Sequence, residues 1–541
     1  MNRKIWKALG IAVCMLALAA PRAMAKTYEV KTGDKFAEAV QEINNKSSDT
    51  ENEIVLCDDI ELTSGQMLTR GQTTIRSNDE DHKITIKGSS AGITVAKKGT
   101  VLNLGEKGYK GTLTIDGKTS GGFVSVLEGA TANMYENVTL QNWQFVGNAC
   151  VVIMGSDSVF NMHGGVIEEC SRAVMADSGT TFHMLDGKIL NCVSGNDGGG
   201  IFLYKATFIM DGGIISGCEG RWGGGLYAEN SSTIEISGGT ISGCKVGAGG
   251  GLFVDSSTIR ISGGIISECT TSDTGNGGGL YAKNSTIKIT GGRIENNKAA
   301  LGGGVALIGD TTFEKPITNW TVIGNEAYAT GGVGGGIKLE NGSMDVSDGS
   351  NRIYNNTADG HGADICLEGG ASSIKLPNAA NMGAKYHDSG IKIDGWYKDD
   401  NPRYRPSKDG KPVENLQLSG PLSLVASYTV IPVRIVIDAN GGVGGSGSQT
   451  VQKGTNVTLE APTKEGHLFK GWKDEKGNSY PAGEDGKVKI TVTGDMTLTA
   501  EWKKLPSAEN LPKTGDESPV LLWGAALAVS AAACFMLRRR K

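Results

Sequence analysis

Residues 223–244 read GGGLYAENSSTIEISGGTISGC, and this stretch decides the fold that we expect. Apolar residues alternate in it with polar or aromatic ones at Leu226, Ala228, Ile234, Ile236 and Ile241. A period of two is typical of short β-strands with one buried face. Glycines separate the strand-like segments, and glycine adopts the positive φ angles of tight corners without a Cβ penalty. The stretch therefore predicts three short strands joined by glycine-rich corners.

Two glycine-rich phrases of this stretch recur along the chain, in which glycine makes up 81 of 541 residues, about twice its ordinary share. One phrase ends at Cys170, Cys192, Cys218, Cys244, Cys269 and Asn297, and the other begins at Gly198, Gly223, Gly249, Gly277, Gly302 and Gly334. Most intervals are 22 to 28 residues long, which is the period of a solenoid whose repeats stack on one another. The sequence thus predicts a mainly β protein built on a parallel β-helix of roughly eleven coils.

This pattern resembles the right-handed, pectin-lyase-like parallel β-helices, whereas a leucine-rich repeat lacks support because no helical segment follows the strands. An open solenoid end exposes strand edges, so we expect a cap at each end. We assign residues 26–52 to an N-terminal helical cap, residues 53–370 to the β-helix, and residues 371–430 to a closing cap and connector. Within the first cap, a helix is expected at Asp34–Asn45 with Phe36, Ala39, Val40 and Ile43 on its buried face.

Five cysteines recur at one position of successive coils: Cys170, Cys192, Cys218, Cys244 and Cys269, with Asn142, Asn297 and Asn325 expected at the same position in flanking coils. They predict a column of small, buried thiols in place of an asparagine ladder. Parallel stacking points neighbouring side chains the same way, which favours reduced thiols over disulfides. Disulfides and a metal site stay open as alternatives, although no CxxC spacing supports a metal. We expect no metal and no cofactor.

A stripe of outward aromatic side chains is predicted on the strand after each GGG. It contains Phe202, Tyr227, Phe253 and Tyr281, one per coil. Sugar rings stack well on such a platform, and repetition adds avidity, so these four residues are our candidate ligand contacts. The alternative is an aromatic ladder that only stabilises the stack. On the next strand, Glu235, Arg260 and Lys288 are expected to form a solvated charged face.

Catalysis needs separate consideration because pectate lyases and polygalacturonases share the resembled fold. Asp186 and Asp211 precede glycines that we take as equivalent in adjacent coils, about 5 Å apart, which is a retaining-glycosidase separation. However, Asp before Gly is an ordinary turn-former. His361 sits in a GHG triplet similar to one of the polygalacturonases, but no Asp-Asp pair or Asn-x-Asp occurs on these strands. His163 and His183 fall out of register with each other, which argues against a metal cluster. We therefore name no catalytic residue and expect a protein that is not an enzyme.

A separate module is predicted at residues 431–503, with alternating strands at its start and further strands near 456–460, 488–492 and 497–502. Its segments FKGW (Phe469–Trp472) and LTAEW (Leu498–Trp502) resemble the internalin-type B repeat, also called the Listeria-Bacteroides repeat. The resemblance implies a small β-grasp-like fold, with Trp472 and Trp502 in its core. We expect the module to act as a stalk, followed by a polar linker at 504–510.

The last segment, residues 511–541, contains LPKTG (Leu511, Pro512, Lys513, Thr514, Gly515), an apolar run at 520–537 and a basic tail, Arg538, Arg539, Arg540 and Lys541. As a helix the run would be about 27 Å long, close to the thickness of a bilayer's hydrocarbon core. The four cations would keep its end cytoplasmic. The order resembles the sorting signals of sortase-anchored surface proteins of Gram-positive bacteria. The resemblance implies that sortase cleaves after Thr514 and joins it to peptidoglycan, with only a transient membrane stage.

The first 25 residues have the three parts of a secretory signal peptide: cations, an apolar stretch, and an A-x-A site at Ala23 and Ala25 before Lys26. Removing residues 1–25, which carry four cations, and the net two positive charges after Thr514 changes the formal charge from −5 to −11. Such an acidic chain repels nucleic acid and anionic lipid, so neither is an expected partner.

These features predict a secreted, cell-wall-anchored protein on a Gram-positive surface. We expect an adhesin that binds a glycan or a protein of a host or neighbouring cell. A wall-bound polysaccharide lyase or glycoside hydrolase of the pectin-lyase-like fold is the first alternative, and a structural spacer is the second.

Overall fold

The computed structural model describes residues 25–46, 51–88, 92–117, 123–144, 149–347, 350–360, 362–368, 372–376, 391–398, 417–419, 422–430, 432–452, 455–483 and 486–505. The chain divides between Thr429 and Val430 into two compact units. The first unit contains the β-helix and the second contains the C-terminal module, and each is described by itself.

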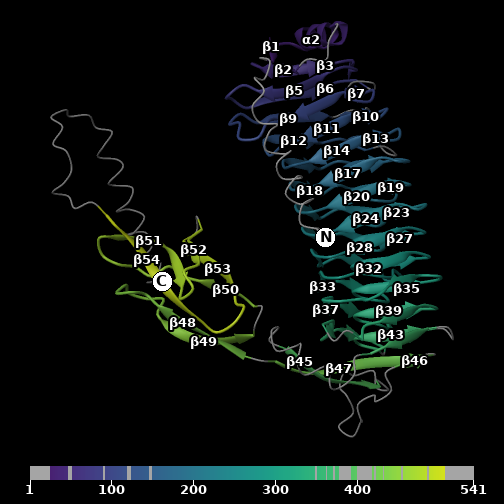
Figure 1. Cartoon of the computed structure of the whole chain (residues 1–541), viewed down its shortest axis with the longest axis vertical. Helices are drawn as coiled ribbons and strands as arrows, with labels where there is room; N and C mark the ends of the chain where they lie inside the picture. Colours follow the sequence, from purple (N-terminus) through teal and green to yellow (C-terminus); the bar gives the residue numbers. More distant parts are fainter. Residues whose placement is uncertain are drawn as a thin grey trace, which may run out of the picture. The chain divides into compact units, whose positions relative to one another are not determined.

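The β-helix consists of short parallel strands that repeat in the same order in each coil and stack into sheets (Figure 1). The first sheet has 15 strands: β1 (Lys26–Val30), β2 (Glu51–Leu56), β5 (Gln72–Ser77), β8 (Val101–Leu104), β11 (Thr131–Met134), β14 (Val159–Met162), β17 (Thr181–Met184), β20 (Thr207–Met210), β24 (Thr233–Ile236), β28 (Thr258–Ile261), β32 (Thr286–Ile289), β36 (Thr312–Glu314), β40 (Ser343–Asp345), β44 (Ser373–Lys375) and β46 (Gln417–Ser419).

Two further sheets complete the three-sided coil. The 12-stranded sheet contains β3 (Ile60–Leu62), β6 (His82–Ile86), β9 (Leu113–Gly117), β12 (Val138–Gln141), β15 (Val166–Glu168), β18 (Lys188–Leu190), β21 (Ile214–Ser216), β25 (Thr240–Ser242), β29 (Ile265–Ser267), β33 (Arg293–Glu295), β37 (Thr321–Ile323) and β41 (Arg352–Tyr354). The 14-stranded sheet contains β4 (Gly65–Leu68), β7 (Gly92–Ala96), β10 (Val124–Leu127), β13 (Val151–Met154), β16 (Val174–Ala176), β19 (Ile201–Tyr204), β23 (Leu226–Glu229), β27 (Leu252–Asp255), β31 (Leu280–Lys283), β35 (Val305–Ile308), β39 (Ile337–Glu340), β43 (Ile365–Glu368), β47 (Leu422–Val430) and β45 (Ile391–Lys398).

A fourth sheet of six strands was not expected from the sequence. It contains β22 (Glu219–Trp222), β26 (Lys245–Ala248), β30 (Thr270–Thr271), β34 (Lys298–Ala299), β38 (Glu326–Ala327) and β42 (Thr357–Ala358). These strands are only two to four residues long, too short to show an alternating pattern. The first three of these strands begin directly after Cys218, Cys244 and Cys269, at the turn that we call the cysteine corner. Most coils from the middle of the solenoid onward therefore have four strands rather than three. The expected parallel β-helix is confirmed, with about 12 coils instead of eleven, since 12 strands stack in the second sheet.

The core lies between the three main sheets, where like residues stack in columns along the solenoid. Phe160, Phe182 and Phe208 form one such column on β14, β17 and β20, with ring centroids 5.4 and 5.2 Å apart. Each ring is completely buried. The stacking follows from the in-register pairing of parallel strands, which places identical positions of neighbouring coils about 4.8 Å apart.

Both ends of the solenoid are covered. At the start, α2 (Gly33–Asn45) buries the four expected residues Phe36, Ala39, Val40 and Ile43, and Figure 1 shows it across the end of the stack. Its N-terminus is capped by the Thr32 hydroxyl, which accepts a hydrogen bond from the Lys35 amide. At the other end, β46 and β47 pair antiparallel with β44 and β43, which interrupts the parallel stacking.

The cysteine corner is present, with one correction to the predicted column. Cys170, Cys192, Cys218, Cys244 and Cys269 stack in register, followed by Asn297, Asn325 and Asn356. In the coil before Cys170 the column residue is Trp143, because Gln141 pairs with Glu168 and Asn142 therefore lies one position early. Asn142 belongs to a neighbouring column of positive-φ residues, where asparagine tolerates the left-handed conformation. Asn142 was expected in the cysteine column because asparagine is a common residue of such columns, although the strand register places it beside the column.

All five column cysteines are buried free thiols, as are Cys150 and Cys366, whereas the free thiol of Cys57 is partly exposed. Each column sulfur lies 3.2 to 3.6 Å from the carbonyl oxygen two residues before it, to which the thiol donates. The glycine triplets fit against this corner. A Cβ on Gly225 would lie 2.7 Å from the Gly251 oxygen and 3.5 Å from the Cys244 sulfur, so only glycine allows this approach.

The second unit is a small antiparallel-rich β module with its own core. One sheet contains β49 (Gly447–Gln452), β48 (Pro432–Asp438), β54 (Met496–Lys504), β51 (His467–Asp474) and β52 (Ser479–Pro481), and a second pairs β50 (Asn456–Leu459) with β53 (Val488–Thr491). Trp472 is completely buried in the core, as expected. Trp502 only packs against the edge of that core and is partly exposed, so the expectation for this residue holds in part.

Several predicted features lie outside the described residues. They are most of the signal peptide, including Ala23, the LPKTG motif, the apolar run at 520–537, nearly all of the 504–510 linker, and His361. Within the part of the chain that the structure does describe, no helix is long and apolar enough to cross a bilayer.

Candidate functional site

One row of outward side chains runs along the 15-stranded sheet, with one residue per coil in register. We call it the outward row: Glu53, Thr74, Asn103, Asn133, Asn161, His183, Ile209, Glu235, Arg260, Lys288 and Glu314. We call the segment from Thr74 to His183 the polar half of the row, and the segment from Glu235 to Glu314 the charged half. Only Glu235, Arg260 and Lys288 of this row were expected from the sequence. Part of the rest has a sequence signal, because Asn133, Asn161, His183 and Ile209 each precede a core methionine in ANM, FNM, FHM and FIM.

The polar half of the row contains a hydrogen-bonded ladder of side-chain amides. The Asn161 amide donates to the Asn133 oxygen at 2.9 Å, Asn133 donates to Asn103 at 2.8 Å, and Asn103 donates to the Thr74 hydroxyl at 3.2 Å. An asparagine side chain has two N–H donors and an oxygen with two lone pairs. Each amide inside the ladder uses one donor and one lone pair. Asn133 and Asn161 are partly exposed, whereas Asn103 is only 8% exposed, so the hydrogen-bonding groups left for a ligand lie mainly on Asn133 and Asn161.

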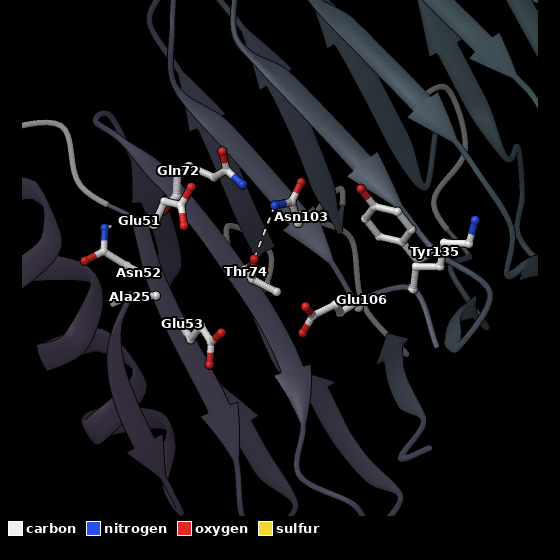
Figure 2. A pocket seen from close by; sticks show the side chains of 11 residues that line it. Ala25, Glu51, Asn52, Glu53, Gln72, Thr74, Asn103, Glu106 and Tyr135 are labelled. Carbon is white, nitrogen blue, oxygen red and sulfur yellow. Dashed lines mark hydrogen bonds between the residues drawn. The ribbon is translucent and has the colours of Figure 1, made fainter. Parts of the chain in front are cut away.

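A polar cavity of about 270 Å³ opens beside the start of this ladder (Figure 2). It is lined by Ala25, Glu51, Asn52, Glu53, Gln72, Thr74, Asn103, Gly105, Glu106, Lys107 and Tyr135. Figure 2 shows the lining side chains on neighbouring strands of one face, with Tyr135 beyond Asn103. The cavity therefore offers carboxylates, amides and hydroxyls together, which suits a ligand rich in hydroxyl groups.

Arg76 fixes two of the carboxylates beside this cavity. Its guanidinium lies 3.1 Å from a Glu53 oxygen and 3.7 Å from a Glu106 oxygen, and it stacks over the Tyr109 ring at 4.0 Å. Only about a tenth of the Arg76 side chain is exposed. Because the cation is shared between both glutamates and clamped on a ring, this part of the site is preorganised.

His183 continues the row and takes part in a second polar network. Its Nε2 lies 2.7 Å from Asp211, whose other oxygen accepts a hydrogen bond from the Ser237 hydroxyl at 2.6 Å. The hydrogen bond from Ser237, and to a smaller extent the one from His183, lowers the pKa of Asp211. Nearby, His163 stacks on Tyr135 with ring centroids 5.0 Å apart, and burial lowers its pKa. The histidines occupy different columns, as expected.

The expected equivalence of Asp186 and Asp211 is wrong. Lys188 pairs with Ile214, so Gly187 lies opposite Gly213, and Asp186 lies opposite Gly212 instead of opposite Asp211. The Asp186 carboxylate accepts a hydrogen bond from the Gly187 amide, which is an ordinary turn contact. The two carboxylates therefore have different partners and do not form the symmetric pair that the sequence suggested.

The charged half of the row borders a second cavity of about 250 Å³, lined by Ile209, Asp211, Glu235, Ile236, Ser237, Arg260, Ile261, Ser262, Lys288 and Thr290. Its charges are neutralised by one another. Arg260 lies 3.5 Å from Glu235 and 3.7 Å from Glu314, and Lys288 lies 3.3 Å from Glu314. Since these groups are exposed, the pairs contribute little to stability, and this segment is the solvated charged face that we expected.

The aromatic stripe lies on the 14-stranded sheet and forms a continuous stack. Ring centroids of Phe202, Tyr227, Phe253 and Tyr281 are 5.7, 5.2 and 4.6 Å apart in that order. Tyr227 is only 8% exposed and Phe253 7%, because Ala248 and Trp222 of the fourth sheet pack against the stack. Burial raises the pKa of both Tyr227 and Tyr281. The two central rings of the candidate ligand contacts therefore present little surface to a ligand.

No group of three or more histidine, cysteine or acidic side chains among the described residues is arranged to hold a metal ion. The cysteine column, although rich in sulfur, is buried and lined up along one direction.

Comparison with known protein families agrees with the two units. Residues 126–319 and 210–380 match a right-handed beta helix region, and residues 431–506 match the divergent InlB B-repeat domain. The solenoid is therefore right-handed, as predicted, and the B-repeat prediction is confirmed. No curated protein and no solved structure matches the chain. A β-helix joined to a B-repeat domain fits a surface protein or a carbohydrate-binding protein.

Proposed function

We propose that this protein is a secreted, cell-wall-anchored surface protein whose β-helix binds a glycan along the polar half of the outward row. The observation that carries the proposal is the amide ladder of Asn103, Asn133 and Asn161. It repeats hydrogen-bonding groups at the coil spacing, next to a polar cavity. A chain of sugar hydroxyls, each both donor and acceptor, is complementary to such a surface.

The surroundings of the ladder favour a sugar over a protein segment. The Tyr135–His163 stack supplies a flat aromatic surface near the cavity, where a sugar ring can pack. The cavity of about 270 Å³ is lined mainly by polar side chains, which suit the hydroxyl groups of a sugar better than a large apolar side chain. Repeated weak contacts along several coils then add through avidity. This placement differs from our first candidate, the aromatic stripe, whose central rings are covered.

The proposed localisation in the cell wall depends on the two ends of the chain. A signal peptide cleaved between Ala25 and Lys26 would send the chain across the membrane, and sortase would join Thr514 to peptidoglycan. Ala25 lines the polar cavity, so cleavage at this bond would also open one side of it. The B-repeat module between β-helix and anchor would serve as the stalk.

The enzymatic alternative finds its best support in the His183–Asp211 contact, which orients a histidine on the same face. A glycoside hydrolase needs two carboxyl groups across the scissile bond, whereas Asp186 and Asp211 lie one position out of register and have different hydrogen-bond partners. We therefore propose binding without turnover, with a lyase or hydrolase as the alternative and a structural spacer as the second.

A binding panel tests these functions against each other. The soluble fragment Lys26–Thr514 is incubated with neutral and uronic-acid polysaccharides and host glycans, and both retention and release of reducing or unsaturated ends are measured. We expect retention without release. Two amide contacts are worth roughly 1–3 kcal/mol, so Asn133→Ala with Asn161→Ala should weaken binding about five- to 150-fold.

The matched control removes side chains from the other face. Tyr227→Ala with Tyr281→Ala should leave glycan affinity within about twofold, provided that both variants retain the far-UV circular dichroism spectrum of the native fragment. Loss of binding only in the tyrosine variant would move the site to the aromatic stripe. Product release would support the enzyme, and absence of binding to every glycan would support the spacer; either result contradicts the proposal.

A further inference from the structure

The B-repeat module contains a cavity of about 480 Å³ whose lining is dominated by cations. It is formed by Asn440, Lys464, His467, Lys470, Lys473, Thr499, Ala500, Glu501, Trp502 and Lys504. Four lysines and one histidine face a single carboxylate, in a protein whose proposed mature form has a net charge of −11. Because the overall field repels anions, attraction at this place must come from the local cluster.

Strands β51 and β54 contribute three of the four lysines that line this cavity, Lys470, Lys473 and Lys504. His467 pairs with Lys504, and Lys473 with Thr499, across the antiparallel strands β51 and β54. The register shifts between Phe469 and Gly471, so Lys470 is the extra residue of a bulge. A bulge re-aims its side chain relative to the regular sheet.

The four lysines of this cavity differ in whether they have partners. Lys473 lies 3.7 Å from Glu501, and Lys464 donates to the Asn440 carbonyl oxygen and lies over the Trp502 ring at 5.7 Å. Within the described residues of the module, Lys470 and Lys504 form no ion pair, and both side chains are exposed. A lysine ammonium offers three donors and no acceptor, which suits an oxygen-rich anion.

Trp502 gives the cavity a rigid floor. Its indole N–H donates to the Ala439 carbonyl oxygen at 3.1 Å, and its ring contacts Phe469 edge-to-face with centroids 5.6 Å apart. The partly exposed ring can pack against the aliphatic backbone of a polymer while the lysines contact its charges. The lysines and the Trp502 ring together suit a polymer in which anionic groups alternate with short carbon units.

We propose that this cavity binds a phosphodiester-linked polyol polymer of the wall, which makes the stalk a second, non-covalent attachment. The inference rests on the proposed wall anchorage, because only eight residues lie between Leu505 and Thr514. At about 3.5 Å per extended residue, the module stays within roughly 30 Å of the attachment point. Wall anchorage would bring anionic polymers of the wall within that reach.

The test uses the soluble Lys26–Thr514 fragment and synthetic poly(glycerol phosphate) at a series of salt concentrations. We expect binding that weakens as salt rises, and about tenfold weaker binding for Lys470→Gln with Lys504→Gln at low salt. The matched control, Lys476→Gln with Lys489→Gln, removes the same charge from exposed positions outside the cavity and should change affinity less than twofold. Thermal unfolding of both variants verifies that they fold alike.

Equal loss in the two lysine variants would reduce the effect to net charge and overturn the proposal. Binding of heparin or polygalacturonate without binding of poly(glycerol phosphate) would also overturn it, as would absence of any polyanion binding. The outcome is separable from the β-helix proposal, because Asn133→Ala with Asn161→Ala should leave poly(glycerol phosphate) binding unchanged. Neutral dextran serves as the uncharged control.

Discussion

Replacing Phe182 with alanine should cause the largest loss of stability of any single truncation in the aromatic core column. The ring is 0% exposed and lies between Phe160 and Phe208 at 5.4 and 5.2 Å. A buried Phe→Ala change costs about 3–5 kcal/mol through lost transfer energy and the cavity left behind. Each aromatic pair adds roughly 0.5–1.5 kcal/mol beyond its buried area, so we expect about 5 kcal/mol, at the upper end of that range.

The matched control is Phe202→Ala, the same chemical change at the end of the outward aromatic stripe. Phe202 is partly buried, with one ring neighbour at 5.7 Å and the Arg172 guanidinium 5.0 Å above it. We expect about 1–2 kcal/mol for this residue.

Urea unfolding of the soluble fragment, followed by far-UV circular dichroism, measures both variants. The β-helix transition of Phe182→Ala should move to clearly lower urea, while that of Phe202→Ala moves only slightly. Since stacked repeats unfold as coupled neighbours, midpoints of the same transition are compared rather than absolute free energies. Equal shifts in the two variants, or a larger shift for Phe202→Ala, would refute the assignment of inward and outward faces.

Three further predictions concern the corner and the polar row. In the native fragment a thiol reagent should modify Cys57 and none of the seven buried thiols, which react only after unfolding; native labelling of Cys218 or Cys244, read by mass spectrometry, would contradict the corner. Gly225→Ala should destabilise by roughly 1–3 kcal/mol because its Cβ would meet the Gly251 oxygen at 2.7 Å, whereas Gly195→Ala, with nothing within 4 Å, should cost under about 0.5 kcal/mol; similar melting temperatures would argue against the tight corner. The bonds from Ser237 and His183 lower the pKa of Asp211, so its stabilising contribution is present above its unfolded pKa of 3.8 and disappears as pH falls through the lower folded value. The small difference in melting temperature between wild type and Asp211→Asn should therefore be visible at pH 6 and shrink as the pH falls below 3.8, and a difference that grows over that range would be inconsistent with this sign.

The regular part of the fold follows from the sequence because one physical constraint repeats in every coil. Alternation at Leu226, Ala228, Ile234 and Ile236 marks the buried face of two sheets, and it recurs often enough to define the stacking. The cap helix is equally legible, since Phe36, Ala39, Val40 and Ile43 have helical spacing on one face.

The features that the sequence did not reveal are those without periodicity inside a coil. The strand Thr270–Thr271 has two residues and no alternation, so the fourth sheet was missed, and with it the cover over Tyr227 and Phe253. Trp143 was missed in the corner column because its side chain resembles neither cysteine nor asparagine. The outward row mixes Asn, His and Ile, and its unity lies in strand register, which a composition pattern does not show.

The most direct test of the account concerns the bond that places this protein on the cell surface. Cell walls from a strain that makes the protein are extracted with hot detergent and digested with a muramidase, and the released C-terminal peptide is analysed by mass spectrometry. We expect a peptide that ends at Thr514 and carries a wall peptide through an amide bond. A chain that detergent extracts completely, or a C-terminal peptide that continues through Gly515 to Lys541, would contradict it.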